Sequence, residues 1–95
     1  MGQSAEERGR LLALLKHNHE FPGPYSLKAI VRAGDETGVV SAVSATRARV
    51  LDVAKKPSSK GSYVSVRLRL HVPSAEAVLD VHDVLSELDS VLTTL

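Results

Sequence analysis

The sequence predicts an α+β fold in which strands and helices alternate around one core. Two stretches, 25–33 and 64–72, alternate apolar and polar side chains as half-buried strands do. Two others, 39–43 and 78–88, repeat apolar residues at helical spacing. A chain of 95 residues can build one modest core and is too short for two. We therefore expect a single domain.

The first twenty residues predict a helical extension outside that domain. Ser4 and Glu7 form a capping-box pattern for a helix that starts at Ala5. Its leucines share one face: Leu11, Leu12 and Leu15. Phe21-Pro22-Gly23-Pro24 is a rigid connector that ends the helix. The predicted organisation is an extension over residues 1–20 and a domain over residues 21–95.

The first half of the domain is predicted to form a strand, a loop and a helix. Alternation runs from Tyr25 to Ala33, and a glycine-containing acidic loop follows at 34–38. Asp35 is expected to cap a helix with a valine-rich face that ends near Thr46. The glycine at position 38 also leaves room for a ligand to approach the first amides of that helix.

The second half begins with a hairpin. A weaker strand from Arg49 to Lys56 stops at Pro57, which favours a sheet edge. A turn over 57–62 then leads into the clearest strand of the chain, which ends at Val72. These two strands should pair directly.

Pro73-Ser74 ends the third strand and predicts a capped helix over about 75–88. One side of this helix is apolar, and the other carries four acids that repel one another unless cations lie nearby: Glu76, Asp80, Asp83 and Glu87. A short last strand, Val91–Leu95, completes the chain.

The element order is therefore strand, helix, strand, strand, helix, strand, which is the ferredoxin-like βαββαβ pattern. It predicts a four-stranded antiparallel sheet with both helices on one face, plus the N-terminal helix. The alternation places five basic side chains on the other, open face: Lys28, Arg32, Arg67, Arg69 and His71. The two interpretations of this face are an anion-binding surface and ordinary solvated side chains.

Charge and composition narrow the class of protein. The net charge is +1, but the charges are unevenly distributed along the chain. Residues 25–72 contain nine Lys or Arg and three acids, whereas residues 73–95 contain five acids and no Lys or Arg. The chain has no cysteine, which excludes disulfides and thiolate sites. The longest apolar cluster, Leu11–Leu15, is far below the roughly 20 residues that cross a bilayer. We expect a cytoplasmic protein without a membrane partner.

No residue set specifies a reaction, so we expect no enzyme activity, no catalytic residues, no metal and no cofactor. His17 and His19 stand two apart, a spacing that puts the two rings on different sides of a helix and favours solvated linker residues. We expect His82 to be a partly buried packing residue. Lys60-Gly61-x-Tyr63 stands where RNA-recognition domains place an RNP1 segment, but the match stops at the glycine, because Ser62 and Val64 occupy the positions of its stacking aromatics.

Two family resemblances complete the sequence evidence. Residues 27–43 look like the start of an ACT domain, whose loop often contacts an amino-acid effector; a plain capping loop is the other interpretation. The 21–28 segment, the hairpin at 56–66 and the ending from Ser74 resemble the YbeD-like family of small bacterial proteins of unknown function. That resemblance implies an ACT-like version of the ferredoxin-like fold, a cytosolic location and no established activity.

The functional prediction is a non-enzymatic, ACT-like regulatory or binding domain that senses a small anionic metabolite or binds a protein partner. The alternative is a weak nucleic-acid-binding domain that uses the basic open face. We expect a homodimer, formed through sheet edges or the open face. The candidate ligand contacts lie in the first loop, the hairpin and the third strand: Gly34, Asp35, Gly38, Lys60, Arg67 and Arg69.

Overall fold

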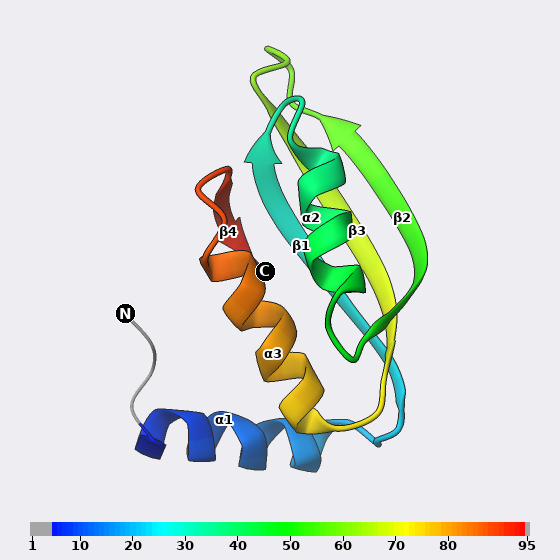
Figure 1. Cartoon of the computed structure of the whole chain (residues 1–95), viewed down its shortest axis with the longest axis vertical. Coiled ribbons are helices and arrows are strands. Elements are labelled where there is room, and N and C mark those ends of the chain that lie inside the picture. The colour runs from blue at the N-terminus through cyan, green and yellow to red at the C-terminus, as the bar shows by residue number, and fades with distance from the viewer. Residues whose placement is uncertain (1–4, 95) are drawn as a thin grey trace.

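A computed structural model describes residues 5–94. Its three helices and four strands follow the predicted order after the N-terminal helix: α1 Ala5–Asn18, β1 Gly23–Arg32, α2 Glu36–Ser44, β2 Arg49–Pro57, β3 Tyr63–Val72, α3 Ala75–Ser86 and β4 Val91–Thr94. The strands form one antiparallel sheet in the order β2-β3-β1-β4 (Figure 1). The predicted capping residue Ser4 and the last residue of the predicted final strand lie outside the described residues.

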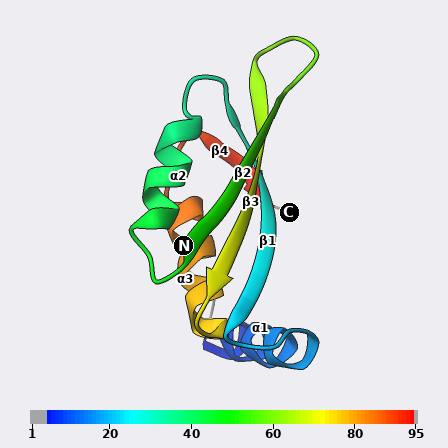
Figure 2. The same ribbon diagram turned by 90° about the vertical axis from the view of Figure 1, so that its right-hand side faces the viewer.

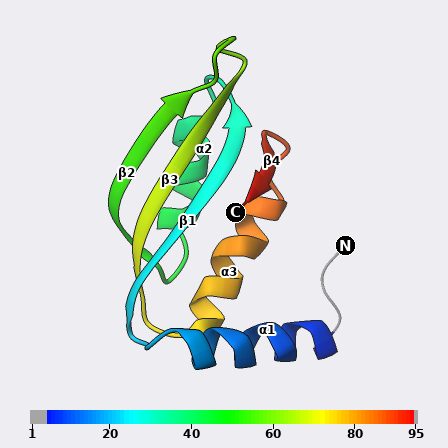
Figure 3. The same cartoon turned by 180° about the vertical axis from the view of Figure 1, so that it is seen from behind.

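Both α2 and α3 cover one side of the sheet, and the other side is open (Figure 2). This confirms the ferredoxin-like arrangement with two helices on one face. We call the uncovered side the open face; Figure 3 shows β2, β3 and β1 from this side, in front of α2. The hairpin between β2 and β3 projects beyond the helices.

Period-two alternation places the core on the helix side of the two central strands. In β3, five alternate residues are buried, and Leu68 and Leu70 are fully enclosed. In β1 the buried side chains include Leu27, Ala29 and Val31. Valines from α2 and the apolar side of α3 close this core, so the apolar pattern selects which face of the two central strands is covered.

The pairing of the two central strands, β1 and β3, determines which residues lie opposite each other across the sheet. β1 and β3 run antiparallel in unbroken register from Gly23 opposite Val72 to Arg32 opposite Tyr63. β2 is an edge strand, as predicted, and its register shifts between Val50 and Asp52. β4 is the opposite edge and reaches only the last residues of β1.

Helix α1 lies across one end of the domain, beside the first turn of α3 (Figure 1). It contributes no buried residue, although Leu15 packs against the core. The leucines at 11, 12 and 15 are half-buried, while Leu14 is exposed. The helix is therefore an extension that rests on the domain rather than part of its interior.

Candidate anion-binding site on the open face

The register brings basic side chains of three strands together on the open face. Arg67 in the middle of β3 lies directly opposite Lys28 of β1 on one side and Ala54 of β2 on the other. In the next row toward the hairpin, Ser65 lies opposite Lys56. Because residues of one face recur every second position, these two rows are adjacent.

A hollow of about 400 Å³ lies over these rows. Its lining comprises four cationic residues, an alanine and a serine: Lys28, Ala54, Lys55, Lys56, Ser65 and Arg67. No acid lines it, and none of the four cations forms an ion pair within residues 5–94. We call this site the basic hollow. It concentrates unneutralised positive charge beside the hydroxyl of Ser65.

The acids of α3 form ion pairs with cations that do not belong to the open face, so they do not neutralise the open-face cations. Arg8 of α1 donates from Nη1 to both carboxylate oxygens of Asp83 at 3.1 Å. Arg47, between α2 and β2, donates from Nη2 to Asp80 at 2.6 Å. Lys16 Nζ lies 3.8 Å from Glu76. The repulsion expected along the acidic side of α3 is thus offset by cations from α1 and from the loop before β2.

The six predicted contact residues do not form one site. Arg67 lines the basic hollow, and Arg69 lies in the neighbouring row, opposite Asp52. Lys60 lies in the hairpin turn, outside the hollow. The prediction that Arg67 and Arg69 face away from the helices is confirmed by the burial pattern of β3.

The three predicted contacts in the first loop lie at the hairpin end of the molecule. Ala33 N donates to Ser62 O at 3.0 Å, so the loop after β1 and the hairpin are joined there. Gly34 and Asp35 lie in this loop, and Gly38 lies in the first turn of α2, on the covered side of the sheet. The loop and the basic hollow are therefore separate places.

One expectation about this loop needs correction. Asp35 does not cap α2 through its side chain. Instead, the Glu36 carboxylate accepts a hydrogen bond from Gly34 N at 2.6 Å. Gly34 has a φ of 95°, a left-handed conformation that favours glycine. Gly38 has no such constraint, and a Cβ there would meet open space.

The sequence assigned Lys28 to the open face but did not indicate that Lys56 and Ser65 would line the same hollow. The Lys55-Lys56 doublet was visible in the sequence, but nothing local indicated which β3 residues it would meet. That depends on the pairing of β2 with β3, in which Lys56 lies opposite Ser65.

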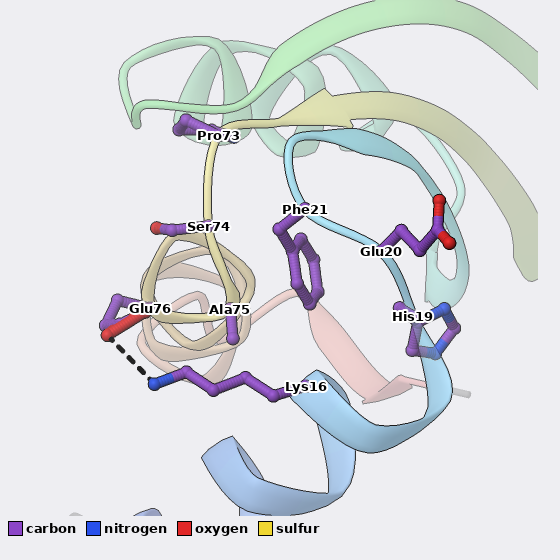
Figure 4. A pocket seen from close by; sticks show the side chains of 8 residues that line it. All are labelled: Lys16, His19, Glu20, Phe21, Pro73, Ser74, Ala75 and Glu76. Carbon is purple, nitrogen blue, oxygen red and sulfur yellow. Dashed lines mark ion pairs between the residues drawn. The ribbon is translucent and has the colours of Figure 1, made fainter.

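A larger hollow of about 620 Å³ lies where α1 and its connector meet the start of α3 (Figure 4). Its charged lining is mixed: Lys16 pairs with Glu76, and Glu20 adds a second acid. Ser74 lines it too, and its hydroxyl accepts from Ala77 N at 3.2 Å, which confirms it as the cap of α3. Because Lys16, Glu76 and Ser74 already have partners of their own and the charges are mixed, the larger volume does not make this hollow the better anion site.

Two histidines, His19 after α1 and His82 of α3, contact the ring of Tyr25. His17 and His19 are both exposed, as predicted, and the ring of His19 also lies 5.3 Å from that of Tyr25. Tyr25 also contacts His82 edge to face, and burial raises the pKa of Tyr25. Burial lowers the pKa of His82, with a smaller opposing effect from Asp83, in agreement with the predicted packing role.

Residues 5–94 contain no group of three or more His, Asp or Glu side chains placed to hold a metal ion. No helix among these residues is long and apolar enough to span a membrane.

Comparisons with known proteins give a family and a fold. Residues 16–95 match the family model described as protein of unknown function, DUF493. UPF0250 proteins from two strains of Xanthomonas campestris pv. campestris are each 35% identical over 83 residues, which covers 83% of this chain and 90% of theirs.

Two solved structures share the fold at low sequence identity. The solution structure of protein HP0495 from H. pylori has a TM-score of 0.69 at 16% identity, covering 82% of this chain and 86% of that one. The C-terminal domain of the MgtC protein from Mycobacterium tuberculosis has a TM-score of 0.64 at 18% identity, covering 82% and 88%.

Proposed function

This chain belongs to the DUF493 family of proteins of unknown function, as its YbeD-like motifs predicted, and we propose that it is a non-enzymatic domain that binds a small anionic ligand in the basic hollow. The family supplies no activity to transfer. The proposal therefore rests on the chemistry of the open face.

The observation that carries it is the set of three open-face cations, Lys28, Lys56 and Arg67, around a hollow whose lining contains no acid. Lys55 also lines the hollow, but it lies opposite the buried Val66, so alternation assigns its side chain to the other face. Lys28 and Arg67 are direct cross-strand neighbours, and like charges in that position destabilise a sheet. A bound anion would remove this repulsion. The planar guanidinium of Arg67 suits bidentate contact with a carboxylate or phosphate, while the lysines act as point charges.

The volume of the hollow fits a small ligand, because it lies within the roughly 300–1,000 Å³ typical of ligand pockets. Its lining is more polar than that of most such pockets, so charge rather than apolar burial would supply the affinity. We therefore expect binding that weakens as the salt concentration rises.

The homodimer stays a prediction. Features of the edge strand β2 oppose a dimer that forms by strand pairing at that edge. Lys55, Lys56 and Pro57 stand on that strand, and its register shift lies near Asp52. Edge lysines, proline and bulges are features that oppose strand addition. Sedimentation with and without pyrophosphate tests whether a dimer forms through the other edge, β4, or through the open face.

The proposed ligand class can be tested with pyrophosphate and citrate as probes. Each is expected to raise the melting temperature, because a ligand at one hundred times its Kd stabilises a protein by about 2.7 kcal/mol. Lys28→Ala and Arg67→Ala should abolish the shift. Arg10→Ala is the matched control, since Arg10 is an exposed cation of α1 that does not line the hollow. No shift with either probe, or an equal loss in Arg10→Ala, would refute the proposal.

A further inference from the structure

The positive charge of the open face continues beyond the basic hollow. Along β3, Arg69 lies one row past Arg67. In the other direction, Arg32 lies at the end of β1, and Lys60 stands in the projecting hairpin. Within strands β1 to β4, the open face carries one acid, Asp52, opposite Arg69. The cations therefore form a track along the strands rather than a single cluster.

An exposed aromatic ring lies at the hairpin end of this track. Tyr63, the first residue of β3, is 42% exposed and lies directly opposite Arg32. Its backbone pairs with Ser58 across the base of the hairpin, which holds its position. A solvent-accessible ring beside a guanidinium is a platform on which an unpaired base can stack.

We infer that the open face binds a single-stranded nucleic acid that lies along β1 and β3, with phosphates on the basic rows and a base on Tyr63. This inference rests on the proposed anion site, which would hold one of the phosphates. It differs in requiring residues outside the hollow, among them Tyr63 and Lys60.

The length of the track supports a linear polyanion. From Arg69 to Tyr63 the strand advances six residues, which at about 3.3 Å per residue is roughly 20 Å. A strand of stacked nucleotides carries a phosphate about every 3.4 Å, so roughly six nucleotides fit. A small anion in the basic hollow would leave Arg32 and Lys60 outside the contact, since neither lines the hollow.

The exposed ring of Tyr63 favours a single-stranded over a double-stranded nucleic acid. A duplex keeps its bases stacked and presents no free face to Tyr63, whereas a single strand does. Because Tyr63 is the exposed aromatic of this face, one stacked base is expected. Binding should therefore depend mainly on phosphates, with strong salt dependence and little preference for sequence.

Fluorescence anisotropy with a labelled 12-nucleotide oligo(U), titrated at several salt concentrations, tests the inference. Each phosphate contact contributes about −0.7 to the slope of log K against log salt for single strands. Arg67→Ala should therefore flatten the slope by about 0.7. Tyr63→Ala should weaken binding about 5- to 150-fold with the slope unchanged, and Tyr63→Phe should restore affinity. Arg10→Ala is the charge-matched control.

The outcomes separate this inference from the proposed function. Pyrophosphate binding should survive in Tyr63→Ala, because Tyr63 does not line the basic hollow. Absence of oligonucleotide binding at 50 mM salt, with pyrophosphate binding intact, overturns the inference alone. Equal affinity for a duplex or for oligoglutamate, or wild-type affinity in a folded Tyr63→Ala protein, also overturns it. If pyrophosphate does not bind the wild-type protein, both proposals are refuted.

Discussion

Two arginines on one strand provide a matched test of the electrostatics of the open face. Arg67 and Arg69 are both exposed on β3, and both point away from the helices. Arg67 lies opposite Lys28, whereas Arg69 lies opposite Asp52. Replacing each arginine by glutamate should therefore change the free energy of unfolding in opposite directions.

The magnitude follows from cross-strand pairing. A favourable or unfavourable charged pair across two strands contributes roughly 0.2–1 kcal/mol. Arg67→Glu turns a repulsive pair into an attractive one and should stabilise the domain by about 0.5–1.5 kcal/mol. Arg69→Glu does the reverse with Asp52 and should destabilise by about 0.5–1 kcal/mol. For a domain of this size, 1 kcal/mol is a shift of roughly 4–8 °C in Tm.

Urea denaturation and calorimetry of both variants at about 20 mM and 500 mM salt would measure these changes. The opposing shifts should shrink at high salt, because the Debye length falls to a few ångströms. Arg67→Glu should also lose pyrophosphate binding, so the more stable protein is the one that no longer binds. Changes in the free energy of unfolding that have the same sign in both variants, or that do not depend on the salt concentration, would refute this electrostatic reasoning.

Three further predictions concern the fold. Leu68→Ala should lower the free energy of unfolding by about 2–5 kcal/mol in urea, because Leu68 is fully buried, while Leu51→Ala on the exposed edge should change it much less. Ser74→Ala should cost about 0.5–2 kcal/mol and Ser74→Asp should restore it, whereas Asp35→Ala should have little effect since Asp35 makes no capping bond. Burial lowers the pKa of His82, so the unfolded chain binds its proton more readily: stability should be retained above pH of about 6.5 and fall below it, and His82→Gln should flatten that slope in denaturation measured across pH.

Local patterns were sufficient for the elements and their covered faces. Alternation in β3 assigns five apolar side chains to the core and places Arg67 and Arg69 on the opposite face. The serine before α3 marks its start correctly, because a cap is a contact within one turn. The same reasoning was wrong for Asp35, since the choice between two neighbouring acids depends on the path of the loop. There, Glu36 reaches back to Gly34 instead.

Contacts between distant segments could not be predicted in this way. The acids of α3 were visible as a repulsive stripe, but their partners Arg8 and Arg47 come from segments 75 and 33 residues away. Nor did spacing reveal that Lys56 lies opposite Ser65, because strand pairing depends on the hairpin and on the register shift in β2.

The sequence by itself determined the order of strands and helices, the core face of each, and a basic surface opposite the helices, because side-chain periodicity is a local property. Only the tertiary structure decided which cations meet. It sets Lys28 against Arg67 at the basic hollow, and it removes Arg8, Lys16 and Arg47 from consideration by pairing them with α3. The physical reason is that net local charge depends on distances between chain segments, and those distances are fixed by register and helix docking.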